Sequence, residues 1–258
     1  MGSPIAKLGF KSLRFIEELG AMARFALDVT ITMAIRPFRA AALVRELYKL
    51  GVLSLVIICV SGLTVGMVLG LQGHHTLTRY GAIQSLGALV GVSLIRELGP
   101  VLTALLVAGR AGSAAAAEIG SMVATQQLDG LRMLSIDPLS LVIKPKALAM
   151  QIVTPMLTAM FICCGIYGGY LVGVGTFGGD PGSYMSSLQS AVDFRNDIEC
   201  CLLKSIIFGF FLGLIATYRG YTSAPTAEGV SAATTSSVVI SSVTVLLADY
   251  AITALWGI

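Results

Sequence analysis

The feature that most constrains this chain is a series of apolar stretches, each about 20 residues or longer, with few or no charged residues. A helix of that length crosses the hydrocarbon core of a bilayer. Such stretches occupy residues 51–71, 84–112, 147–172, 200–218 and 238–255. They are continuously apolar and lack the two-residue alternation of a barrel strand. We therefore predict an all-α polytopic membrane protein with five transmembrane helices.

Overall composition agrees with this class. Only 12% of the residues are charged and 55% are hydrophobic, whereas a soluble domain carries about a quarter charged residues. The net charge of +3 is small and gives no indication of nucleic-acid binding.

The first 49 residues have a different pattern. Apolar side chains recur at helical spacing in residues 4–35, and Lys7, Lys11 and Arg14 fall on the opposite side. This pattern is typical of an amphipathic helix that lies in the membrane interface. Pro37 interrupts it, and the basic segment 38–49 is expected to be an elbow helix leading into the bilayer. We therefore divide the chain into interfacial and elbow helices (1–49) and a transmembrane domain (50–258).

Four charged residues fall inside the predicted spans: Arg96 and Glu97 in the second, Lys204 in the fourth and Asp249 in the fifth. An unpaired charge at the centre of a bilayer costs at least about 2.5–3.5 kcal/mol. The four could neutralise one another around a cavity for a zwitterionic or anionic headgroup, or along a proton or ion path. A purely structural ion pair is the third interpretation, and the residues alone leave all three open.

The segment between the second and third spans, residues 113–146, is amphipathic and is expected to form short helices packed against a partner. Lys and Arg number eight in the first 50 residues and three in this segment. The positive-inside rule then places the amino terminus and residues 113–146 in the cytoplasm, and the carboxyl terminus outside.

Glycine recurs every fourth residue in the first span, at Gly62, Gly66 and Gly70. Such a stripe lets another helix approach closely. The stripe is equally compatible with two interpretations. One is a contact with a second copy or a gate, and the other is ordinary packing within one chain.

No catalytic motif is present. The chain has no GxxxxGK[ST] loop, no HExxH and no GxSxG, so we expect neither an enzymatic site nor a bound cofactor. His74 and His75 lack a third ligand nearby, and the five cysteines lie in or beside apolar runs, so no metal site is predicted.

Three long motifs carry a family resemblance. They are RELGPVLTALLVAGRAGSAAAAEIGSM, QQLDGLRMLSIDPLSLVIKPKALA and AEGVSAATTSSVVISSVTVLLADY, which together cover residues 96–122, 126–149 and 227–250. The chain resembles the MlaE (YrbE) permeases of lipid-transporting ABC systems. It departs from the family pattern at Lys146, where arginine is expected, and at Ser135, in a segment that often reads Met-Gly-Ile-Asp-Pro.

The resemblance implies a homodimeric permease in the bacterial inner membrane that moves glycerophospholipid between the inner and outer membranes of a Gram-negative envelope. It implies a separate ABC ATPase that binds ATP and Mg, a periplasmic MCE-domain partner, and a STAS-domain protein attached to the ATPase.

The same resemblance assigns two sets of site residues. The lipid cavity would be lined by Arg96, Glu97, Lys204, Asp249 and Tyr80. Coupling to the ATPase would use Glu118, Ser121, Met122, Asp129 and Arg132. Two other functions use the same features: a secondary transporter coupled to protons or ions through the intramembrane charges, and a membrane scaffold that anchors a periplasmic lipid-binding partner.

Overall fold

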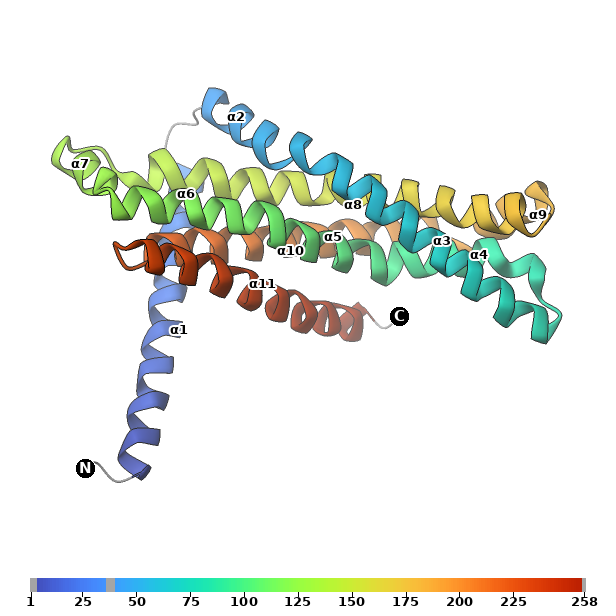
Figure 1. Ribbon diagram of the computed structural model, residues 1–258, viewed down its shortest axis with the longest axis horizontal. Coiled ribbons are helices and arrows are strands. Elements are labelled where there is room, and N and C mark those ends of the chain that lie inside the picture. The colour runs from blue at the N-terminus through green and yellow to red at the C-terminus, as the bar shows by residue number, and fades with distance from the viewer. Residues whose placement is uncertain (1–3, 36–39, 257–258) are drawn as a thin grey trace.

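The computed structural model describes residues 4–35 and 40–256, and every regular element in those ranges is a helix (Figure 1). Among the described residues, five helical segments are long and apolar enough to cross a membrane: Ala40–Tyr80, Ile83–Ala124, Leu139–Thr176, Arg195–Tyr221 and Ala227–Trp256. Each contains one of the five predicted spans, so the predicted all-α membrane fold is confirmed.

Four long helices and one composite helix lie side by side along the long axis of the molecule (Figure 1). The four are α3 (Leu55–Tyr80), α8 (Lys144–Tyr170), α10 (Phe194–Tyr221) and α11 (Ala227–Trp256). The composite helix consists of α4 (Leu86–Ser93), η3 (Leu94–Leu98), α5 (Gly99–Val107), η4 (Ala108–Gly112) and α6 (Ser113–Ala124). Short α7 (Gln127–Met133) and α9 (Pro181–Ala191) lie at opposite ends of the bundle (Figure 1).

The second span stays helical across its charged positions because two turns change their hydrogen bonding. η3 and η4 are π-helical, and they contain Arg96 and Glu97, and Arg110, respectively. Pro100 follows in the first turn of α5 and has no N–H to donate to the preceding turn. A π-turn thus directly precedes Pro100, and such turns often mark functional positions.

The elbow is present as α2 (Ala40–Leu50), followed by η1 (Val52–Ser54); Pro37 lies outside the described residues. Arg110 reaches the end of α2, where its Nη1 donates to the carbonyls of Lys49 (3.2 Å) and Leu50 (3.4 Å) and to Ser54 Oγ (2.6 Å). A cation at the carboxyl end of a helix satisfies carbonyls that have no helical partner. The bend into the first span is thus held by a residue of the second.

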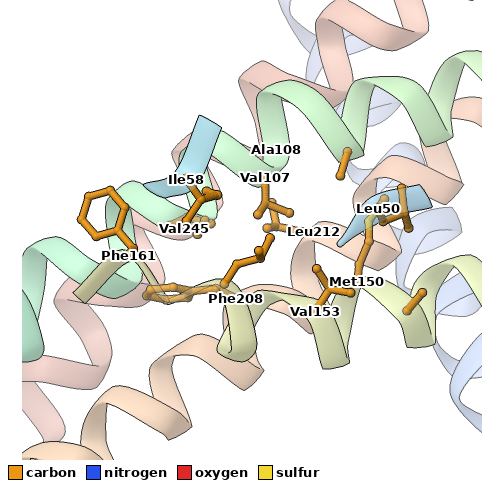
Figure 2. Close-up of a cluster of buried hydrophobic side chains, with 14 of the residues drawn as sticks. Leu50, Ile58, Val107, Ala108, Met150, Val153, Phe161, Phe208, Leu212 and Val245 are labelled. Atoms are coloured by element: carbon orange, nitrogen blue, oxygen red, sulfur yellow. The ribbon is translucent and has the colours of Figure 1, made fainter. Parts of the chain in front are cut away.

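The glycine stripe packs within the chain. A Cβ on Gly66 would lie 1.8 Å from the carbonyl oxygen of Gly165, and one on Gly62 would lie 2.6 Å from that of Phe161. α3 and α8 therefore touch backbone to backbone, and the intramolecular interpretation of the stripe is confirmed. Large buried side chains such as Phe161 and Phe208 fill the core beside this contact (Figure 2).

Helix α1 (Pro4–Ile35) projects from the bundle at a steep angle (Figure 1). Its Phe25 and Val29 are buried in an apolar cluster with Tyr218 of α10, while Leu27 and Ile31 are exposed. The predicted helix is present with apolar side chains on its surface, and its placement in the membrane interface stays a prediction.

Residues 176–199 connect the third and fourth predicted spans and are polar in sequence, yet most of the segment is helical. The Asp180 side chain accepts a hydrogen bond from the backbone N–H of Ser183 at 2.6 Å and so caps α9. Tyr184 of α9 is buried, donates to the carbonyl of Ile166 at 3.2 Å, and has its pKa raised to about 12 by that burial. The shorter segments that complete the chain are η2 (Ile83–Ser85), η5 (Leu139–Ile143) and η6 (Leu171–Thr176).

Candidate functional site

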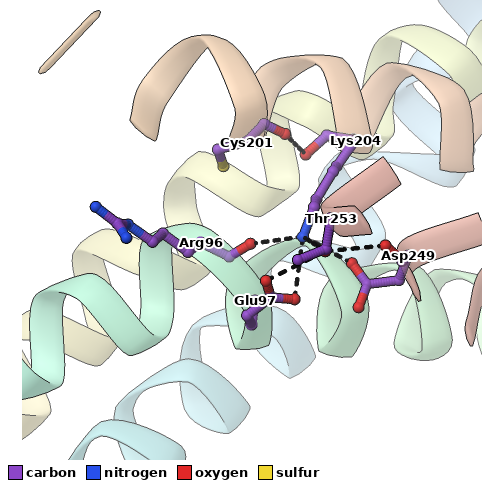
Figure 3. A network of polar contacts seen from close by, with 7 residues as sticks. Arg96, Glu97, Cys201, Lys204, Asp249 and Thr253 are labelled. Atoms are coloured by element: carbon purple, nitrogen blue, oxygen red, sulfur yellow. Dashed lines mark hydrogen bonds and ion pairs between the residues drawn. The ribbon is translucent and has the colours of Figure 1, made fainter. Parts of the chain in front are cut away.

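Lys204 is the centre of a polar network inside the bundle (Figure 3). Its side chain is 1% exposed. The ammonium lies 3.0 Å from Glu97 Oε2 and 2.9 Å from Asp249 Oδ1. It also donates to the Arg96 carbonyl at 2.9 Å and to Thr253 Oγ1 at 2.8 Å. A buried ammonium is tolerated when opposite charges and hydrogen-bond acceptors surround it, and Lys204 has both.

Three helical segments bring these groups together. Lys204 comes from the middle of α10, Glu97 from the π-turn η3, and Asp249 and Thr253 from one face of α11, four residues apart. Thr253 also donates to the Asp249 carbonyl at 2.9 Å and to Glu97 Oε1 at 3.3 Å. Glu97, Lys204 and Asp249, three of the four charges that could neutralise one another, therefore lie together, and their role in a lipid cavity stays a prediction.

The Arg96 side chain points away from Lys204 (Figure 3) and pairs with another carboxylate. Its Nε lies 2.8 Å from Oδ1 of Asp197, whose side chain is 1% exposed. The other Asp197 oxygen accepts from the backbone N–H of Asp193 at 3.0 Å. Arg96 and Glu97 thus take different partners, as expected for neighbours on a helix.

The network is open on one side of the single chain. The Glu97 side chain is 42% exposed, that of Arg96 32% and that of Asp249 18%. Together with Lys204 and Asp197 they carry a formal charge of −1, from two cations and three carboxylates. Exposed charge at this depth of a transmembrane bundle is rare and marks a polar pathway or a binding surface.

An apolar cavity of about 300 Å³ lies between α8 and α10, close to this network. Ile95 and Ile198, the neighbours of the Arg96–Asp197 pair, line it together with Ile162 and Leu202. The site therefore combines charged and apolar surfaces within a few residues of each other. Tyr80, in contrast, ends α3 with 80% of its surface exposed and is not among the described contacts of Lys204 or Arg96.

The residues predicted to couple to an ATPase lie toward the end of the bundle that contains α7. The Glu118 side chain forms ion pairs within the same chain. Glu118 Oε2 lies 2.7 Å from Lys146 Nζ, and Glu118 Oε1 lies 3.5 Å from Lys49 Nζ. Lys146, which is 3% exposed, also pairs with Glu46 at 3.1 Å. Glu118 thus joins α6 to α2 and α8. These residues line a cavity of about 250 Å³ between the three helices.

The remaining predicted coupling residues are distributed over α6 and α7. Ser121 is exposed and Met122 is half-buried against the apolar cluster around α1. Asp129 and Arg132 form an exposed pair at 3.0 Å on α7. The two most exposed apolar side chains in this region, Met133 (88%) and Leu134 (71%), are not among the predicted coupling residues.

Two further residues of the charge network, Asp197 and Thr253, were not predicted from the sequence. Asp197 precedes Lys204 by seven residues, two turns of the same helix, and Thr253 follows Asp249 by four. This spacing could have identified both as neighbours of the predicted charges.

His74 stacks on Phe177 with ring centroids 3.8 Å apart. Within the described residues, no group of three or more His, Cys, Asp or Glu could hold a metal ion.

Comparison with known proteins bears on this arrangement. A family model described as permease MlaE matches residues 43–255. The intermembrane phospholipid transport system permease protein MlaE of Haemophilus influenzae is 46% identical over 251 residues, which cover 97% of this chain and 96% of that protein. A probable ABC transporter permease protein of Rickettsia bellii is 38% identical over 249 residues, 96% of each chain.

A more distant similarity extends to plants. The chloroplast protein TRIGALACTOSYLDIACYLGLYCEROL 1 of Arabidopsis thaliana is 34% identical over 210 residues, 81% of this chain and 60% of that protein. The match to the permease model covers most of the elbow helix, all five predicted spans and the whole charge network. The chain therefore belongs to the MlaE permease family.

Proposed function

We propose that this permease moves glycerophospholipids between the inner and outer membranes of a Gram-negative envelope. Two copies would act together in the inner membrane, with the half-open sides of their charge networks bordering a common lipid cavity. The names of the Haemophilus and Rickettsia relatives, a phospholipid transport permease and a probable ABC transporter permease, support the substrate class and the dependence on an ATPase.

The observation that carries the proposal is the charge network around Lys204. A phospholipid headgroup carries a phosphate and often an amine, so its recognition needs both charge signs in a site from which water is partly excluded. Glu97, Asp249 and Arg96 provide both signs and are partly exposed, while Lys204 holds two of the carboxylates in place. The apolar cavity beside Ile95 and Ile198 offers a surface suited to acyl chains.

ATP hydrolysis would occur in a separate subunit. At the end of the bundle opposite to α9 lies α7, a short helix with exposed apolar and charged side chains. We assign α6 and α7 as the region that docks on the ATPase, with Ser121, Asp129 and Arg132 at its surface and Glu118 holding α6 to the elbow. An MCE-domain protein on the periplasmic side and a STAS-domain protein on the ATPase would complete the assembly.

The test is lipid transfer by the purified transporter in proteoliposomes, with a labelled phospholipid and ATP. Glu97→Gln keeps the side-chain size and removes one of the two charges that hold Lys204. We expect transfer to fall about tenfold, the effect of one lost charge-assisted hydrogen bond, while the ATPase stays bound. The matched control is Glu199→Gln, which changes an exposed carboxylate that, among the described residues, pairs with exposed Arg195.

The outcome also separates the alternatives. Transfer driven by a pH gradient in the absence of any ATPase would establish a secondary transporter instead. Normal transfer by Glu97→Gln would show that the network is structural. A chain that binds a periplasmic partner and never carries lipid would be a scaffold.

A further inference from the structure

The short helix α7 is not a direct continuation of the helix before it or of the helix after it. It is preceded by Gln126 at φ +57° and followed by Ser135 at φ +59°, and both residues are in the left-handed region. Left-handed residues end helical geometry, so α7 is separated from α6 at one end and from η5 at the other. The orientation of α7 therefore depends on its two connecting turns and on its side-chain contacts.

Leu128, Leu131 and Arg132 of α7 make contacts with the bundle. Leu128 is 4% exposed and packs in the apolar cluster that contains Phe25, Ile119 and Ile143. Arg132 donates from Nη2 to the hydroxyl of Tyr221, the last residue of α10. Its Nη1 lies 3.0 Å from Asp129 one turn earlier, which fixes the plane of the guanidinium.

The acceptor is itself held rigidly. The ring of Tyr221 lies 5.6 Å from that of Phe25 of α1, and the ring of Phe25 lies 5.4 Å from that of Tyr218. The Arg219 guanidinium lies 6.0 Å from the Tyr218 ring. Aromatic and cation–π contacts of this kind restrict ring orientation, so the Tyr221 hydroxyl is a fixed point at the carboxyl end of α10.

We propose that Tyr221 is a positioning residue, which orients α7 through Arg132 so that Met133 and Leu134 are presented to the ATPase. The inference rests on the proposed function only for the identity of the partner. The orientation of α7 by Tyr221 is a property of this chain. Because α10 also contains Lys204, one helix would connect the polar network with the docking surface.

The first measurement is hydrogen–deuterium exchange of the full chain in nanodiscs, without ATPase, from milliseconds upward. Tyr221→Phe removes the hydroxyl and keeps the ring contact with Phe25. We expect the amides of residues 127–134 to exchange about three to ten times faster, as follows when a charge-assisted hydrogen bond is lost. Tyr218→Phe, one helical turn away on the same helix, should leave these amides unchanged.

Arg132→Gln serves as a second variant from the other side of the contact. Arg132→Gln also removes the pair with Asp129, so if Arg132 and Tyr221 act as a unit, the double variant should exchange no faster than Arg132→Gln alone. Unchanged exchange in Tyr221→Phe, or fully additive effects in the double variant, would overturn the proposal.

The second measurement uses the complete transporter and counts lipid moved per ATP hydrolysed. Tyr221→Phe should lower this ratio several-fold while the ATPase stays bound and hydrolyses ATP. A change in exchange with an unchanged ratio would overturn the role in docking and leave lipid transport intact. If the unmodified transporter neither binds an ATPase nor moves lipid, the proposed function fails, and the exchange data still decide whether Tyr221 orients α7.

Discussion

At the scale of single residues, the surroundings of Lys204 are explained only by the positive charge of its side chain. Its ammonium is surrounded by two carboxylates, a carbonyl and a hydroxyl, and almost none of it is exposed. Taking a charge out of water costs several kcal/mol unless the pairing is close and complete. The network thus depends on the cation at its centre more than on any single acid.

Replacing Lys204 by Met should therefore destabilise the protein strongly. The change leaves Glu97 and Asp249 facing each other without a cation, and we expect a loss of about 3–5 kcal/mol in the free energy of unfolding. Asp249→Asn should cost less, because Glu97 still neutralises the ammonium. Unfolding in mixed micelles of increasing SDS content measures both, and equal losses for the two variants would contradict the central role of Lys204.

Ser135 is a second residue with an unfavourable conformation. Its φ of +59° is one that glycine adopts without strain. Ser135→Gly should raise the unfolding free energy by about 0.5–1 kcal/mol.

Ser121→Gly is the matched control, because Ser121 is exposed inside the helix α6. There the same change should lower stability by a similar amount. Stabilisation by both variants would show that backbone conformation does not govern the effect. The SDS titration used for Lys204 measures both.

Sequence reasoning at this scale succeeded where charge was scarce. Glu97, Lys204 and Asp249 stood out because a charge inside an apolar run must find a partner. The direction of each side chain was less predictable: Arg96 turns to Asp197, and Glu118 turns to Lys146. Those choices depend on how the helices pack, which no single segment of sequence contains.

At the scale of elements, the contact between α3 and α8 leaves no space for a side chain at Gly66. Gly66→Ala places a methyl group against the Gly165 carbonyl, so the two helices must move apart. We expect a destabilisation of about 1–3 kcal/mol. A thermal melt in detergent measures it.

Gly175→Ala provides the comparison for that variant. Gly175 lies in η6, which continues α8, and a Cβ there would meet nothing within 4 Å. It should melt at or above the temperature of the unmodified chain. Equal losses in both variants would show that the close approach at Gly66 is not the cause of the destabilisation, because helix propensity alone favours alanine over glycine.

The prediction of elements was accurate where apolar length decides and incomplete where capping decides. All five spans were found from their length, and α9 was missed because Asp180-Pro181-Gly182 resembles a turn. The same three residues begin a helix when the aspartate accepts from the N–H of Ser183 and proline occupies the first turn. Turn and helix-start signals use the same residues, and the buried contacts of Tyr184 decide between them.

At the scale of the whole molecule, the two ends of the bundle carry different surfaces. α7 with exposed Met133 lies at one end and α9 with exposed Ser186 at the other (Figure 1). The excess of Lys and Arg near the first end predicts that it is cytoplasmic.

Single cysteines introduced at these two positions test the orientation. In intact spheroplasts, Ser186→Cys should react with a membrane-impermeant thiol reagent, and Met133→Cys should react only after permeabilisation. The unaltered chain corrects for reaction of its own cysteines. The reverse pattern would place α7 outside and remove the basis for docking an ATPase there.

The π-turns of the second span have a consequence for how such a helix can change in evolution. A π-turn holds one residue more than α-helical bonding accommodates, and each extra residue rotates everything beyond it by about 100°. Deleting one residue within Leu94–Leu98 would restore α-helical bonding. Either Glu97 would then turn away from Lys204, or the buried face of α5 would turn away from the neighbouring helices. An insertion or deletion in this span would rotate the residues beyond it away from their contacts. We therefore expect the length of the span to be maintained in evolution as strictly as its charged residues.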